Sequence, residues 1–206
     1  ILEPPDKEAS ELDKFKSIKK FVINLPDRDD RLEHFHKEMS LQEYKYEVVD
    51  AIRHDDGFVG CVLSHIKCLD IAIKRNLDCI VIFEDDFKFH IGRLGLLNLN
   101  INYDVFLLGG HISAAEPVSG QAFQRIIQSE RTEGYIVKKH FYKLLKENFI
   151  DGLSAYLKNP SHENHLDIYW NKLQKENLFY ANDFGFIGYQ FPSYSDITNS
   201  FQQSHT

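Results

Sequence analysis

The chain has 206 residues, 43% of them hydrophobic, and carries a formal net charge of −7. This length is enough for one sizeable core, and the negative charge excludes a general electrostatic attraction to nucleic acid. No apolar run approaches the roughly 20 residues that a membrane-spanning helix needs. The first 20 residues are charged and lack the apolar core of a signal peptide. Because the sequence starts without Met, we expect a piece of a longer chain. Within it we expect an N-terminal arm at 1–17 and a single domain at 18–206.

The cysteines indicate a reducing compartment. Cys61, Cys68 and Cys79 are odd in number and lack the spacing of a metal-binding motif. We therefore expect buried, reduced thiols and a cytoplasmic protein.

Strands and helices alternate in the first 75 residues. The polar residues 1–17 predict a loose arm or a short surface helix. Apolar runs and helical spacing then predict a strand at 18–25, a helix at 28–39 capped by Asp27, an edge strand at 44–49 and a helix at 60–74.

The most informative stretch is the apolar run 79–83, which predicts a strand buried on both faces. It ends in Glu84, Asp85 and Asp86. Adjacent acids repel one another, and burying them unpaired is costly, so a hard divalent cation would relieve them. This arrangement predicts a metal-bridged phosphate site at the end of the strand. A solvated acidic turn after a core strand is the alternative.

The second half continues the alternation less regularly. We expect a short helix at 92–99, strands at 103–108, 132–137, 178–181 and 184–190, helices starting at 139 and 162, and a loop or hairpin insertion at 112–131. Strands separated by helices predict an α/β sandwich with a central, mostly parallel sheet. The chain has no Gly-x-Gly-x-x-Gly fingerprint and no P-loop, which disfavours dinucleotide-binding and Walker-type proteins.

Several polar side chains have both a functional and a structural interpretation. Arg28 and Arg31 lie one helical turn apart and could bind phosphate or a carboxylate, or lie on the surface in solvent. Ser64 and His65, within an apolar helix, could contact a ligand or be satisfied core groups. His111, after Gly109-Gly110, could bind metal or phosphate or be a plain loop residue. Asp167 could be a general base or an ordinary helix carboxylate.

A set of short motifs carries a family resemblance. These are Val22-Ile23-Asn24-Leu25 with Arg28 and Arg31; Gly57-x-x-Gly60-Cys61-x-x-Ser64-His65; Phe83-Glu84-Asp85-Asp86; Thr132-x-Gly134-Tyr135; His165-Leu166-Asp167; and Gln190-x-Pro192-Ser193-Tyr194-Ser195-Asp196-Ile197. Their order and spacing resemble glycosyltransferase family 25, from about Lys20 to Ile197. That family includes bacterial lipooligosaccharide galactosyltransferases and collagen hydroxylysine galactosyltransferases.

The resemblance implies a GT-A-like fold, a UDP-sugar donor and a Mn²⁺ or Mg²⁺ ion. It places the nucleoside at the strand end formed by Val22, Asn24 and Leu25, with Arg28 nearby. Gly60, Ser64 and His65 would shape the donor pocket.

The resemblance also places the metal ion at Glu84 and Asp86, to which we add His111 as a candidate ligand. Asp85 would orient the sugar. The acceptor hydroxyl needs a base, for which we name Asp167, with Asp85 and Asp196 as rivals.

The sequence therefore predicts a metal-dependent glycosyltransferase that moves galactose or glucose from a UDP-sugar to a hydroxyl of a glycan or hydroxylysine. Two alternatives come from other classes. One is an inactive binding module that kept the fold, and the other is a metal-dependent phosphohydrolase using the same acids.

Overall fold

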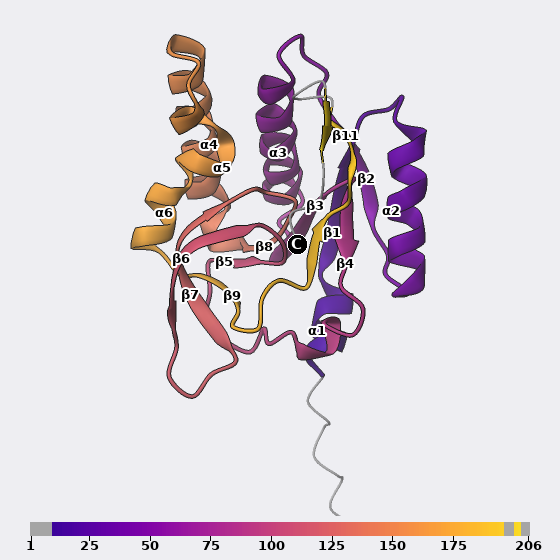
Figure 1. Ribbon diagram of the computed structural model, residues 1–206, viewed down its shortest axis with the longest axis vertical. Coiled ribbons are helices and arrows are strands. Elements are labelled where there is room, and N and C mark those ends of the chain that lie inside the picture. Colours follow the sequence, from indigo (N-terminus) through magenta and orange to yellow (C-terminus); the bar gives the residue numbers. More distant parts are fainter. Residues whose placement is uncertain (1–9, 196–199, 203–206) are drawn as a thin grey trace, which may run out of the picture.

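The structure is a computed structural model that describes residues 10–195 and 200–202. Its main strands are β1 (Lys19–Asn24), β2 (Glu47–Asp50), β3 (Cys79–Glu84), β5 (Val105–Leu107), β6 (His111–Pro117), β7 (Phe123–Glu130), β8 (Gly134–Lys138) and β9 (Phe179–Asn182). Within the described part of the chain they form one sheet in the order β2-β1-β3-β8-β5-β9-β7-β6 (Figure 1).

This sheet is mixed, and one direction dominates. β1 pairs in parallel with both β2 and β3, and β5 pairs in parallel with β9. Of the eight strands in this sheet only β8 and β7 run against the others, each antiparallel to both of its neighbours. The predicted α/β class with a central, mostly parallel sheet is confirmed.

Helices cover both faces of the sheet (Figure 1). They are α1 (Glu11–Ser17), α2 (Asp29–Leu41), α3 (Gly57–Lys74), α4 (Tyr142–Lys158), α5 (Leu166–Tyr169) and α6 (Asn171–Glu176). One core cluster joins α3, α4, α5 and α6 to the sheet, and a second joins α1 and α2 to its other face. The alternation along β1 fits this division, because Phe21 and Ile23 lie in the first cluster and Val22 lies in the second.

Short elements complete the chain. They are the 3₁₀ helices η1 (Leu94–Leu96), η2 (Lys139–Phe141) and η3 (His162–Asn164), and the strands β4 (Phe87–Phe89), β10 (Gly188–Gln190), β11 (Ser193–Ser195) and β12 (Ser200–Gln202). β10 pairs with β4, which follows the acids directly. This pairing brings the chain near residue 190 back to the end of β3.

Residues 11–17 form the short helix that was one of the two expectations for the N-terminus. Ser10 and Asp13 make a capping box at its start. Phe15 is fully buried, and Lys20 donates from β1 to the carbonyl oxygens of Phe15 and Ile18 at the end of α1. α1 is therefore packed into the second core cluster instead of lying loose.

Three local predictions differ from the structure. Asp27 does not cap α2, because Arg28 holds the N-cap position and Asp27 instead pairs with Arg53. The helix expected from 162 is divided into η3, α5 and α6, because His165 has an extended backbone. The helix expected around 92–99 is reduced to the single 3₁₀ turn η1.

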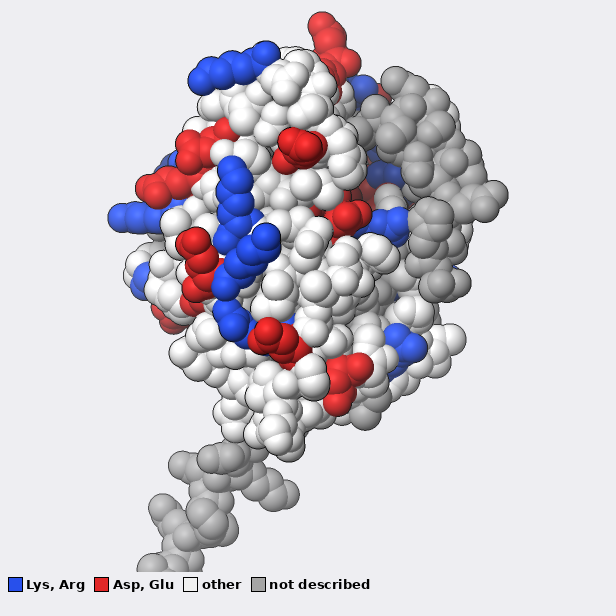
Figure 2. Space-filling view, turned by 60° about the vertical axis from the view of Figure 1, so that its left-hand side comes forward, with Lys and Arg blue, Asp and Glu red and all other residues white. Residues whose placement is uncertain are grey.

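The insertion at 112–131 is the hairpin β6–β7, which extends the main sheet at the end opposite to β2. On the face shown in Figure 2, acidic and basic side chains are interspersed. None of the described helices is both long enough and apolar enough to cross a membrane.

Candidate functional site

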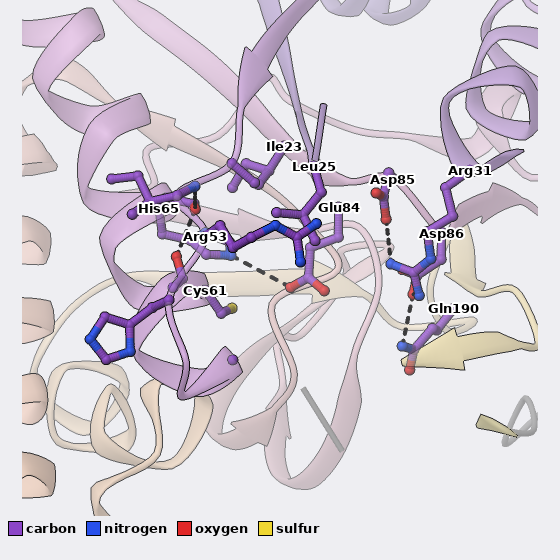
Figure 3. A pocket seen from close by; sticks show the side chains of 16 residues that line it. Ile23, Leu25, Arg31, Arg53, Cys61, His65, Glu84, Asp85, Asp86 and Gln190 are labelled. Carbon is purple, nitrogen blue, oxygen red and sulfur yellow. Dashed lines mark hydrogen bonds and ion pairs between the residues drawn. The ribbon is translucent and has the colours of Figure 1, made fainter. Parts of the chain in front are cut away.

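A cavity opens at the carboxyl ends of β1, β2 and β3, beside the start of α3 (Figure 3). Its walls come from Ile23 and Leu25, from the loop 51–54, from the first turns of α3, from Glu84-Asp85-Asp86 and from Gln190. Parallel strands deliver ligand-binding residues to this edge of an α/β sheet. The acidic stretch therefore lies where the sequence predicts a site.

Arg31 of α2 lies between two of the acids (Figure 3). Its Nη1 is 2.6 Å from Asp85 Oδ1, and its Nη2 is 2.9 Å from Asp86 Oδ2. Gln190 Nε2 also donates to Asp86 Oδ2, at 3.0 Å. Arg31 further donates to Ser193 Oγ and to the carbonyl oxygen of Tyr194, so it ties the acids to the chain after β10.

Burial dominates the electrostatics of the acids. Asp85 and Asp86 are 5% and 3% exposed. Burial raises the pKa of Asp85 to about 7, against the opposing charge of Arg31, and burial likewise raises the pKa of Asp86. Glu84 differs, because although burial raises its pKa, the nearby His65 ring and the hydrogen bond from Thr132 outweigh that effect and lower the pKa.

The acids have spare capacity for a cation. Oδ1 of Asp86 is buried and has no hydrogen-bond partner. Carboxylate oxygens are the ligands that Mn²⁺ and Mg²⁺ prefer, and an unpartnered buried acceptor is costly. The donor set at Glu84 and Asp86 therefore fits a hard divalent ion.

Ser64 and His65 both line the cavity, from α3. The Ser64 hydroxyl donates to the Gly60 carbonyl and accepts from the Ile52 N–H, so it is a satisfied structural group. His65 is fully buried, its Nδ1 lies 3.0 Å from the Tyr135 hydroxyl, and its Nε2 faces Glu84 Oε1 at 3.5 Å. Of the pair, His65 is the one that reaches the acids.

The predicted nucleoside end of β1 is divided between two environments. Leu25 lines the cavity, together with Ile23. Val22 points into the core beneath α2 and does not line the cavity. Asn24 is buried, and its amide donates to the Leu25 carbonyl. Arg28 is ion-paired with Asp30 and does not line the cavity.

His111 is not brought to the acids. It is exposed at the start of β6, outside the residues that line the cavity. Across the described residues, the ligand atoms of three His, Cys, Asp or Glu side chains come within 4.8 Å of one another only at Cys61, His65 and Glu84. The set Glu84, Asp86 and His111 expected from the sequence does not assemble here, because β5 and the two glycines that follow it lead His111 into the hairpin.

Asp167 also lies outside the residues that line the cavity. Its Oδ2 accepts from the Arg131 N–H at 3.0 Å, which holds the turn between β7 and β8, where Arg131 has a φ of +72°. Burial raises its pKa. Asp196, the other rival for the base, lies outside the described residues.

Sequence reasoning missed several residues of the cavity. The loop 51–54 contributes Ile52, Arg53 and His54, and α3 contributes Cys61. The loop could have been found, because it follows the strand predicted at 44–49. Gln190 had no local signal, since only the pairing of β10 with β4 brings it to Asp86.

A known protein family matches this chain around the acids, and a relative matches a larger part of it. The model of the family described as Glycosyltransferase family 25 (LPS biosynthesis protein) matches residues 55–116, which run from before α3 through the acids into β6. A Haemophilus influenzae protein named "Putative glycosyltransferase" is 28% identical over 168 residues, which cover 64% of this chain and 59% of that protein. The chain thus spans about three fifths of that relative's length.

Two solved structures are similar to this chain, and the first of them bears on the fold alone. The crystal structure of A197 from STIV matches with a TM-score of 0.51 and 12% identity, covering 92% of this chain and 94% of that one. A structure described as a glycosyltransferase involved in glycosylation of the major capsid of PBCV-1 matches with a TM-score of 0.46 and 9% identity, covering 80% of this chain and 92% of that one.

The family model and the relative both carry the description glycosyltransferase, so glycosyltransferases are the class of protein that this chain is similar to. More narrowly, the family model confirms the resemblance to glycosyltransferase family 25 that the sequence motifs carry, and the name of the relative agrees with it.

Proposed function

We propose that this domain transfers a hexose, galactose or glucose, from a UDP-sugar to a hydroxyl group of a glycan or hydroxylysine, with Mn²⁺ or Mg²⁺ bound. The observation that carries the proposal is the convergence of Glu84, Asp85 and Asp86 on a cavity at the carboxyl ends of three parallel strands. The family match over 55–116 includes these acids and the start of α3.

The residues present suit each part of such a donor. Ile23, Leu25 and Ile52 offer an apolar wall for the base. Glu84 and Asp86 would hold the divalent ion, with the unpartnered Oδ1 of Asp86 as one ligand atom. The ion would offset the negative charge that develops on the leaving diphosphate. Arg31 and Arg53, both at the cavity, add positive charge beside it.

Of the two proposed catalytic carboxylates, Asp85 has the better position for the base. It lines the cavity, and its pKa of about 7, raised first by burial, lies near the working pH of a general base. Asp167 does not line the cavity, and its Oδ2 accepts from the Arg131 N–H. We therefore rank Asp167 below Asp85 as the base, and assign it the role of holding the turn between β7 and β8.

Calorimetric binding of UDP tests the donor site. We expect wild type to bind UDP with Mn²⁺ and to lose binding in EDTA, and Asp86→Asn to bind UDP at least about tenfold more weakly because a metal ligand is lost. Asp151 is an exposed carboxylate on α4. Asp151→Asn is therefore the matched control and should bind UDP as wild type does. Metal-independent binding, or an unchanged affinity in Asp86→Asn, would contradict the proposal.

Product analysis with UDP-galactose, UDP-glucose and candidate acceptors then separates the two alternatives. Transfer of labelled sugar to the acceptor supports the proposal. Release of free sugar and UDP whether or not an acceptor is present identifies a phosphohydrolase, and UDP binding without turnover identifies a binding module.

A further inference from the structure

A second ligand set lies on the wall of the cavity away from Arg31 (Figure 3). Cys61 and His65 are one helical turn apart on α3, so both side chains project from the same face toward the end of β3. Sγ of Cys61, a ring nitrogen of His65 and a carboxylate oxygen of Glu84 all lie within 4.8 Å of one another. All three residues line the cavity.

His65 provides the independent sign of a ligand. The ring is fully buried, and Nε2 has no hydrogen-bond partner among the described residues. Nδ1 meets the Tyr135 hydroxyl at 3.0 Å. When Nδ1–H donates to that oxygen, the lone pair of Nε2 points at the cluster, which is the arrangement by which an outer partner orients a metal-binding histidine.

Glu84 is held in a comparable way. The Thr132 hydroxyl donates to Oε1 at 2.8 Å, and this is the same oxygen that faces His65 Nε2 at 3.5 Å. Carboxylates that bind metal are commonly fixed by such outer hydrogen bonds. Two of the three ligands thus have supporting partners in a neighbouring strand or turn, Tyr135 in β8 and Thr132 just before it.

The donor types select the ion. A thiolate, an imidazole and a carboxylate suit a borderline ion such as Zn²⁺, whereas Mg²⁺ and Mn²⁺ prefer oxygen ligands. Bonds of about 2.0–2.3 Å in a tetrahedral site place ligand atoms about 3.3–3.6 Å apart, so the observed cluster needs only small side-chain movements to close.

We propose that Cys61, His65 and Glu84 form a binding site for Zn²⁺ or a similar borderline divalent ion, with its fourth position open to the cavity. Three protein ligands and one open position are typical of zinc sites that also take a water or a substrate atom. This site is separate from the proposed Mn²⁺ or Mg²⁺ site at Glu84 and Asp86. Glu84 belongs to both sites, and its carboxylate offers one oxygen to each ion. It does not require that the domain be a glycosyltransferase.

Cobalt titration of the metal-free protein tests this site directly, because a Co²⁺–thiolate bond gives a near-ultraviolet charge-transfer band. We expect one Co²⁺ per chain with that band, and its displacement by Zn²⁺. Cys61→Ser should abolish the band, and His65→Gln should weaken Co²⁺ binding at least about tenfold. Cys68→Ser is the matched control, since Cys68 is a buried thiol on the same helix outside the cluster, and it should keep the band.

Two further measurements keep the test decisive. In wild type, Zn²⁺ should slow alkylation of Cys61 as read by mass spectrometry, so the result does not depend on a variant that folds. Asp86→Asn should keep the cobalt band even if it loses UDP binding, which separates this proposal from the function proposed above. Absence of the band, its persistence in Cys61→Ser, or unprotected Cys61 in saturating Zn²⁺ would overturn the proposal.

Discussion

Arg31 supplies the positive charge that opposes the acids at the end of β3. Both of its terminal nitrogens are engaged by carboxylates that are almost fully buried. Removing one partner of such a buried pair typically costs about 3–5 kcal/mol, because the remaining charge stays desolvated. Arg31 therefore keeps Asp85 and Asp86 in the cavity when no metal ion is bound.

The spacing of Arg28 and Arg31 gave no basis for choosing between them. Both lie at the start of α2, one turn apart. The structure separates them because Arg28 is the N-cap, with φ −104° and ψ 58°, and its side chain turns to Asp30. Arg31 lies inside the helix and points at the sheet edge. This choice depends on backbone angles that side-chain spacing does not report.

Glu133, a buried carboxyl just before β8, should make the stability of the folded state depend on pH. It is 2% exposed, and burial, reinforced by the negative charge of Glu84, raises its pKa to about 8. The folded state then holds a proton that the unfolded state releases near pH 4.5. Stability from this group is present below that pH and is lost as the pH rises toward 8, by up to about 1.4 kcal/mol per pH unit.

Glu133→Gln imitates the protonated form and should remove this loss. We expect the unfolding temperatures of wild type and variant to be similar near pH 4.5 and the variant to be more stable at pH 8, as measured by thermal unfolding. Glu163→Gln, an exposed carboxyl on η3, serves as control and should show no such divergence. A constant difference between Glu133→Gln and wild type over this range would refute the shifted pKa.

At the scale of elements, the helices and strands that are defined by the apolar pattern of their own segment were predictable from the sequence. The apolar runs of β1, β3 and β5 and the broad apolar face of α3 locate those elements, since burial imposes the same periodicity in any fold. The division of the helix at 162–175 was not predictable in this way. Trp170 Nε1 donates to the Ser129 carbonyl, and Gln174 contacts the same residue, so β7 fixes these short turns.

Because α3 packs closely against the loop 51–54, we expect Gly60 to be sensitive to substitution. A Cβ at Gly60 would overlap the carbonyl oxygen of Ile52, so Gly60→Ala must displace either the loop or the first turn of α3. Both line the cavity. We expect a loss of stability of about 1–3 kcal/mol from overpacking and weaker UDP binding, measured by thermal unfolding and calorimetry.

Gly95→Ala is the matched control for that substitution. A Cβ at Gly95 meets nothing within 4 Å, so this variant should match wild type in both measurements. If Gly60→Ala also matched wild type, the close approach of α3 to the loop would not matter for the cavity.

At the scale of the whole molecule, the sequence located one wall of the site and missed how the chain closes it. Glu84, Leu25 and His65 were predictable because each follows or lies within a recognisable element. Gln190 and the contacts of Arg31 with Ser193 and Tyr194 join positions more than 100 residues apart. The failed placement of His111 has the same origin, since the course of the hairpin decides on which side of the sheet edge it lies.

The cavity lies in one half of the molecule. Its position predicts which segments a bound donor will stabilise. The lining residues described fall at 23–31, 51–65, 84–86 and 190, and none comes from the β6–β7 hairpin, α4, α5 or α6. Ligand binding stabilises the native state by mass action, by about 2.7 kcal/mol when the free ligand concentration is a hundred times Kd. Local opening of the backbone becomes slowest in the segments that contact the ligand.

Hydrogen exchange read by mass spectrometry measures that distribution. With UDP and Mn²⁺ we expect slower exchange in peptides from the end of β1, the loop 51–54, the start of α3 and the segment around 190, and unchanged exchange at 111–130. Because Arg31 and Gln190 couple Asp86 to the segment around 190, protection there should be lost in Asp86→Asn. Protection centred on the hairpin would instead place the donor at the other end of the sheet, where no acid of β3 could reach it.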